Sequence, residues 1–205
     1  MTKIKKVKIN TSSETTLLGP FLGYVTTDSI KIWLHFEGPY SKIYVTLHPD
    51  KFNEPATKES VLEFHEKDLF TACVTVKGLE KNTKYYYKLW TDEKHEKPFD
   101  LQGLASDDLH FWTLSDDANE QIDFLVMSCH DPTVSTADGY DGHAVWADLP
   151  QIIARGSNEK VRFALLVGDQ LYADAWEETI LKETDDKAAL RHYLSAYRKY
   201  WSNRY

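Results

Sequence analysis

Two short polar segments carry the side chains best suited to chemistry. Residues 127–132 read Met-Ser-Cys-His-Asp-Pro, and residues 167–174 read Val-Gly-Asp-Gln-Leu-Tyr-Ala-Asp. Cys129, Asp169 and Tyr172 supply a thiol, a carboxylate and a phenol. Thiols and phenols lose their protons most readily beside a strongly Lewis-acidic cation. The three residue types therefore predict a metal-binding site, provided that the fold brings them together.

The secondary-structure elements around these two segments are expected to bring the three side chains together. Residues 122–127 and 163–167 are near-continuous apolar runs, typical of parallel strands buried on both faces. A helical stretch is expected between them, over residues 144–154. The order strand, helix, strand predicts a right-handed crossover and a parallel pair. Ligands in such sheets bind beyond the carboxyl ends of the strands, so Cys129 and Asp169 should lie close together.

The spacing by itself leaves a second interpretation open. Many α/β proteins end a strand in Gly-Asp, as Gly168 and Asp169 do here, because glycine lets the backbone turn sharply. A single cysteine at a strand end, such as Cys129, is more often an inert packed residue than a ligand. We expect His130 to be a solvated loop residue.

The first half of the chain has a different pattern, of short alternating strands. Ile30, Ile32, Leu34 and Phe36 alternate with more polar residues, which predicts a strand with one apolar face. Seven short strands over roughly 100 residues predict an antiparallel immunoglobulin-like or fibronectin type III-like β-sandwich. The expected strands lie near residues 21–26, 30–36, 43–47, 60–64, 69–77, 84–91 and 109–114.

One turn supports the sandwich. Residues 78–87, Gly-Leu-Glu-Lys-Asn-Thr-Lys-Tyr-Tyr-Tyr, place a tyrosine just after a leucine-containing turn at the start of a strand. This resembles the tyrosine corner of fibronectin type III domains, in which the phenol hydroxyl bonds to upstream backbone. We therefore expect these tyrosines to be core and corner residues rather than catalytic ones.

The chain divides into a tail (1–16), a sandwich domain (17–115) and a second, partial domain (121–205), with an acidic linker at 115–120. The last segment, 187–201, is amphipathic and is expected to be a helix packed on the sheet. Its apolar positions are Leu190, Tyr193, Leu194, Tyr197 and Trp201.

Composition limits the partners and the compartment. The formal net charge of −8 argues against nucleic acid and anionic membranes as partners, because both bind basic surfaces. We find no secretory signal and no apolar run long enough to span a bilayer. Cys73 and Cys129 are expected to lie in different domains, so no disulfide and a cytoplasmic location are predicted.

Several blocks of the sequence resemble the alkaline phosphatase D (PhoD-like) metallophosphoesterase family. Residues 165–174 resemble its Gly-Asp-x-x-Tyr block, and residues 124–129 resemble its strand that ends in Ser-Cys. Residues 19–33 are similar to the start of its sandwich domain, and residues 191–200 to its Tyr- and Arg-rich helix. The resemblance covers nearly the whole chain in the family's order.

The resemblance implies a calcineurin-like phosphoesterase fold for the second domain and hydrolysis of phosphate monoesters or diesters. It also implies iron and calcium as cofactors. On the matching positions, Cys129 and Tyr172 would ligate the iron, and Asp169 would bridge the iron and the calcium. Such a bridge holds two cations close enough to clamp phosphoryl oxygens and to activate an attacking oxygen.

The sequence also departs from the family. PhoD-like proteins continue into an Asp-Asp-His-Glu-like block and further histidines, whereas this sequence stops at Tyr205. His130, His143 and His192 do not lie in that downstream motif. We therefore expect the isolated chain to hydrolyse phosphate esters poorly or not at all. We also expect its uncovered strands to favour self-association. The alternatives are a non-catalytic sandwich module that binds or supports a partner, and a degenerate fragment without activity.

Overall fold

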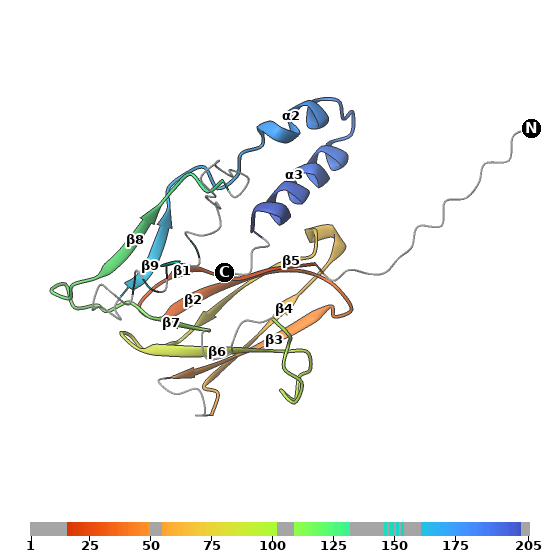
Figure 1. Ribbon diagram of the computed structural model, residues 1–205. Coiled ribbons are helices and arrows are strands. Elements are labelled where there is room, and N and C mark those ends of the chain that lie inside the picture. The colour runs from red at the N-terminus through yellow and green to blue at the C-terminus, as the bar shows by residue number, and fades with distance from the viewer. Residues whose placement is uncertain are drawn as a thin grey trace, which may run out of the picture.

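The computed structural model describes residues 16–49, 55–101, 109–131, 146, 148–149, 151, 153 and 161–201. The predicted tail, residues 1–16, lies outside the described residues except for Thr16. Within the described ranges, seven strands form two antiparallel sheets (Figure 1). One sheet has the order β1 (Thr16–Val25), β2 (Ser29–Glu37) and β5 (Thr71–Lys77). The other has the order β4 (Lys58–Glu63), β3 (Lys42–Pro49), β6 (Lys84–Trp90) and β7 (His110–Trp112).

The core lies between these two sheets. Alternate residues of β2, from Ile30 to Phe36, face it, because successive side chains of a strand point to opposite faces. Ile43, Val45 and Leu47 of β3 face it from the opposite sheet and are 0% exposed. The predicted antiparallel β-sandwich is confirmed, and each of the seven expected strands overlaps an observed one.

The predicted tyrosine corner also forms, and its tyrosine is Tyr85. The backbone N–H of Glu80 donates a hydrogen bond to the hydroxyl of Tyr85 at 2.9 Å. Tyr85 is 2% exposed, and Leu79 in the preceding turn is 6% exposed. The bond fixes the chain entering β6 against the core, and it gives the hydroxyl a partner in an otherwise apolar environment.

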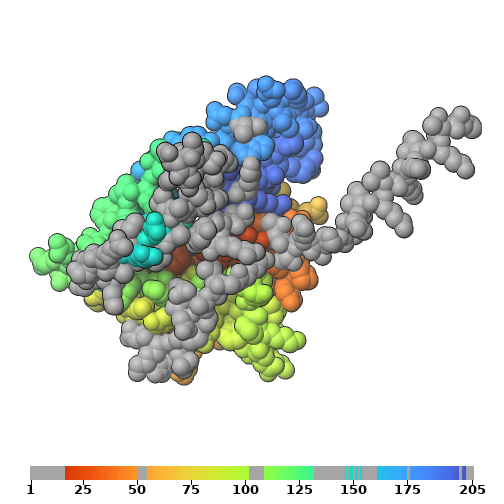
Figure 2. All heavy atoms as spheres, viewed as in Figure 1, coloured from red at the N-terminus to blue at the C-terminus, as the bar shows by residue number. Residues whose placement is uncertain are grey.

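The second part of the chain contains a two-stranded parallel sheet and two helices. β8 (Asp123–Met127) pairs in parallel with β9 (Val161–Leu166), as predicted. The two helices α2 (Asp174–Leu181) and α3 (Asp186–Trp201) pack on each other and form a lobe above the sandwich (Figures 1 and 2). Residues 146, 148, 149, 151 and 153, inside the predicted crossover helix, are helical.

The prediction that these parallel strands are buried on both faces is wrong. Phe124 and Val126 of β8 are 49% and 60% exposed, and Leu165 of β9 is 42% exposed. Phe124 stacks on Phe163 of the neighbouring strand at 5.3 Å, so one face of the sheet carries an apolar strip open to solvent. The segment that contains β8 lies at the surface of the molecule (Figure 2). Leu166 of β9 is 43% exposed as well, so neither face of this two-stranded sheet is fully buried. A strand is buried on both faces only where a layer covers each of them.

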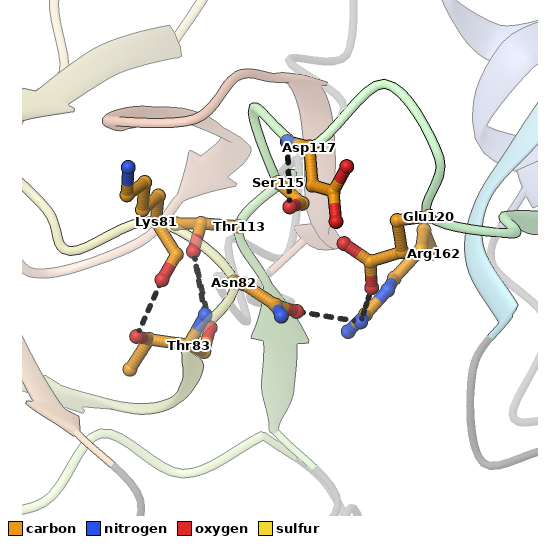
Figure 3. Close-up of polar contacts among 8 residues, drawn as sticks. All are labelled: Lys81, Asn82, Thr83, Thr113, Ser115, Asp117, Glu120 and Arg162. Carbon is orange, nitrogen blue, oxygen red and sulfur yellow. Dashed lines mark hydrogen bonds and ion pairs between the residues drawn. The ribbon is translucent and has the colours of Figure 1, made fainter.

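Arg162 of β9 connects the second part to the sandwich (Figure 3). One amino group donates to Asn82 Oδ1 at 2.8 Å and to Glu120 Oε1 at 3.0 Å. The guanidinium lies 4.3 Å from the ring centre of Trp112 in β7. The Arg162 side chain is 4% exposed and that of Glu120 is 14% exposed, so this ion pair is buried. The predicted linker is thus tied to both parts of the chain at Glu120.

Helix α3 covers the predicted range, but only part of its predicted apolar face packs: Trp201 meets Phe21 of β1, with 5.7 Å between ring centres. Leu190, Tyr193 and Tyr197, expected to be buried, are 43%, 40% and 44% exposed. Ala196 and Tyr200 are buried instead. The reason is geometric: the C-terminal end of α3 points towards the sandwich, so its last turns make the contacts (Figure 1). Among the described residues, no helix is both long and apolar enough to span a lipid bilayer.

Candidate metal centre

The backbones of the two predicted segments remain paired beyond the ends of β8 and β9. The N–H of Cys129 donates to the carbonyl of Gly168 at 3.3 Å, and the N–H of His130 donates to that of Asp169 at 3.0 Å. Cys129 and Asp169 have positive φ angles of 61° and 51°, in the left-handed region, and Gly168 has a φ of 131°. Only glycine adopts that last conformation without strain. The strand ends thus turn sharply at the same place.

This turn brings the three predicted residues together. The thiol of Cys129 donates to Oδ2 of Asp169 at 3.4 Å, and the hydroxyl of Tyr172 donates to the same oxygen at 3.0 Å. Ser128 Oγ lies 3.4 Å from Cys129 Sγ, a contact that the sequence did not predict. Both hydrogen bonds to Asp169 are exposed to solvent, so the group sits at the surface.

Two protons, one on the Cys129 thiol and one on the Tyr172 phenol, point to the same oxygen of the Asp169 carboxylate. The neighbouring Cys129 thiol and, next, the Asp169 carboxylate raise the pKa of the Tyr172 phenol, because its O–H is used as a donor and an anion there would be repelled. A bound cation would take the place of these protons, since thiol and phenol ligands bind metals in their deprotonated forms. The donor set therefore fits a metal ion, as a partial set of ligands.

His130 is not the solvated loop residue that we predicted. Its Nδ1 accepts a hydrogen bond from Trp146 Nε1 at 3.1 Å, and its Nε2 lies 3.1 Å from the backbone carbonyl of Tyr200. Its ring also lies 4.8 Å from that of Trp201. Both ring nitrogens are thus engaged by helical residues far away in the sequence, for which the local sequence carries no signal.

Neither of the other two histidines in the second part of the chain is seen to join Cys129, Asp169 and Tyr172 among the described residues. His192 pairs with Glu183 Oε1 at 2.9 Å, and His143 lies outside the described residues. Within the part of the chain that the structure describes, no group of three or more His, Cys, Asp and Glu side chains could hold a metal ion. Both Cys73 and Cys129 are free thiols, as expected.

Comparisons with known proteins support the fold. The sequence family described as a domain of unknown function (DUF7800) matches residues 13–105, which include most of the sandwich. No curated protein matches the chain. Among solved structures, the chain is similar to one titled "Structure of PhoD", with a TM-score of 0.50 and 16% sequence identity. That match covers 77% of this chain and 27% of the PhoD chain, so this chain spans about a quarter of the PhoD length.

Two β-sandwich structures are also similar over part of the chain. One is a computationally redesigned β-sandwich protein, with a TM-score of 0.33 and 17% identity over 49% of this chain and 96% of that chain. The other is a fibronectin type III domain of human collagen XX, with a TM-score of 0.31 and 17% identity over 42% of this chain and 84% of that chain. At 16% identity, the likeness to PhoD is a likeness of fold.

Proposed function

We propose that this chain forms the first part of a PhoD-like, metal-dependent phosphoesterase, with Cys129, Asp169 and Tyr172 as metal ligands and phosphate esters as substrates. The observation that carries the proposal is the convergence of the thiol and the phenol on one carboxylate oxygen, at 3.4 Å and 3.0 Å. A sandwich that served only for adhesion would not need these three groups at one edge of a second sheet.

The extent of the PhoD likeness supports this proposal. A match over 77% of 205 residues involves about 158 residues, whereas the sandwich predicted over 17–115 has only 99. The likeness therefore extends into the second part of the chain, where the parallel pair β8–β9 and the following helices would begin a calcineurin-like α/β domain. One fold can host many reactions, so the proposed reaction is inferred from the site residues rather than from the fold.

The donor types suit the two proposed metals. A thiolate and a phenolate are appropriate ligands for iron, and a carboxylate oxygen suits calcium. When bound, such metals would stabilise negative charge on a phosphoryl group. Asp169 would provide the shared oxygen, and Cys129 and Tyr172 would each give up a proton. Three donors do not complete the coordination of two ions, so we expect the 205-residue chain alone to hydrolyse phosphate esters weakly or not at all.

Binding of inorganic phosphate tests the proposal without requiring turnover. We expect isothermal titration to detect phosphate binding to the chain loaded with iron and calcium, and no binding to the metal-free chain. Asp169→Asn should abolish the metal-dependent binding, whereas Cys73→Ser, a change of the other free thiol, should leave it intact. Phosphate binding that is equal with and without metal, or metal loading without any phosphate binding, would contradict the proposal.

A non-catalytic binding module is the second candidate, and two observations favour it. The matching sequence family covers only residues 13–105, and the sandwich itself has a surface hollow of about 390 Å³. The hollow is lined by the aromatic residues Phe36, Tyr40 and Phe99 together with polar residues such as Lys97 and Asp100. If this candidate is correct, Asp169→Asn should alter no ligand binding, while substitutions in the hollow should.

A further inference from the structure

The last turn of α3 contacts both loops of the candidate metal centre. Trp201 Nε1 donates to the carbonyl of Gln170 at 3.0 Å. The hydroxyl of Tyr200 lies 3.3 Å from the carbonyl of Tyr172 and 3.3 Å from Oδ1 of Asp131. Its one proton is shared between these two acceptors. The backbone carbonyl of Tyr200 in turn lies 3.1 Å from His130 Nε2. One helical turn therefore joins the loop after β8 to the loop after β9.

The same end of α3 is fixed to the sandwich. Arg198 donates to Glu37 Oε2 at 2.7 Å and to His35 Nε2 at 3.1 Å, both on β2. The ring of Trp201 meets that of Phe21 in β1 edge-on, with 5.7 Å between their centres. The helix end is thus held by the sandwich at the point where it reaches the candidate site.

We propose that the last turn of α3, through Tyr200 and Trp201, is the positioning element that sets the separation of Cys129 from Asp169 and Tyr172. This inference rests on the proposed metal site for its function. The contacts fall where such a role requires them: Gln170 follows Asp169 directly, His130 follows Cys129 directly, and Tyr172 is contacted at its own carbonyl.

Energetics explain why the loops need this support. Non-glycine residues in the left-handed region, as Cys129 and Asp169 are, persist only where surrounding contacts hold them. The sheet that carries the loops has two strands in the described part of the chain, which gives them few backbone partners. Tyr200, in contrast, is 2% exposed, so its contacts are made in a well-packed environment.

Two variants test the role. Tyr200→Phe removes the hydroxyl, and Trp201→Phe removes the indole N–H while each keeps an aromatic ring. Tyr197→Phe is the matched control, because Tyr197 lies on the same helix and is 44% exposed. In the metal-free protein, amide hydrogen exchange is measured at Cys129 and His130, whose N–H groups bridge the two loops, and at Leu125 inside β8, whose N–H faces β9. With metal, Co²⁺ serves as the probe ion, and its affinity is taken from the thiolate charge-transfer band.

We expect exchange at Cys129 and His130 to accelerate about tenfold or more in both variants, with exchange at Leu125 unchanged. We expect the Co²⁺ affinity to fall about 10–100-fold, the usual effect of losing a residue that orients ligands. Unchanged exchange in the loops would overturn the inference. Equal acceleration at Leu125 would overturn it too, by showing a general loss of stability. Faster loop exchange with no Co²⁺ binding to the unaltered chain would support the positioning role and refute the proposed metal site.

Discussion

Replacing Arg162 by methionine should detach β8 and β9 from the sandwich while the sandwich stays folded. The change removes the hydrogen bonds to Asn82 and Glu120 and leaves the Glu120 carboxylate without its cation at 14% side-chain exposure. Breaking a buried ion pair on one side costs about 3–5 kcal/mol. We expect about 3 kcal/mol, the lower end, because another nitrogen of Arg162, Nη1, is already buried without a hydrogen-bond partner among the described residues.

Hydrogen exchange followed by mass spectrometry measures this effect locally. At 1.4 kcal/mol per factor of ten, a loss of about 3 kcal/mol accelerates exchange about 100-fold when it acts on local opening. We expect that acceleration in the amides of β8 and β9 and little change in β2, β3 and β6. Unchanged exchange in β8 and β9 would refute the reasoning, as would equal acceleration throughout the sandwich.

Two further variants separate the ion pair from a general effect of charge. Lys81→Met removes an exposed pair with Asp116, whose side chains are both 61% exposed, and should have little effect because water screens such pairs. Adding Glu120→Gln to Arg162→Met removes the stranded charge and should restore a large part of the lost protection. If the double variant is as unstable as the single one, the carboxylate is not the source of the loss.

Three other expectations follow from particular contacts. Tyr85→Phe should lower the free energy of unfolding by about 1–2 kcal/mol in urea denaturation, because the Glu80 N–H loses its acceptor. Tyr87→Phe on the same strand should cost less, and an equal loss would argue against the corner bond. The pKa of His35 is lowered from 6.5, first by burial and then by the nearby Arg198, so the unfolded chain binds more protons as the pH falls below about 6.5. Stability should therefore be lost in that range and less so in His35→Gln; identical pH profiles of the two proteins would exclude this contribution. We predict that the chain self-associates through the exposed apolar strip, so Val126→Glu should reduce concentration-dependent association in sedimentation velocity; no association of the unaltered chain, or an unchanged association constant, would contradict this.

The sandwich could be predicted because its signals are local and repeated. The alternation of apolar and polar residues in β2, from Ile30 to Phe36, indicates which face of the strand is buried. The turn before Tyr85 indicates where strand β6 begins. The proximity of Cys129 and Asp169 could also be predicted, since parallel strands end at the same edge of a sheet. Each of these features follows from a rule that links short-range pattern to geometry.

The failed predictions concern contacts between distant parts of the chain. The apolar residues of β8 and β9 show that these strands can be buried. Whether they are buried depends on the layers that cover the sheet, and the exposed Val126 shows that one face is not covered. The sequence places His130 in solvent because no local pattern around it indicates that Trp146 and Tyr200 are its hydrogen-bond partners. The sequence also gives no signal for the buried ion pair of Arg162 and Glu120, because both residue types are usually exposed.

Iron binding by the purified 205-residue chain tests the central claim most directly. The chain is reconstituted with iron and calcium, and bound metal is measured by elemental analysis together with the visible absorption spectrum. We predict bound iron with a thiolate or tyrosinate charge-transfer band, which weakens in Cys129→Ser and in Tyr172→Phe and persists in Cys73→Ser. Absence of bound iron, or iron and a spectrum that are the same in all four proteins, would contradict the assignment of Cys129 and Tyr172 as ligands.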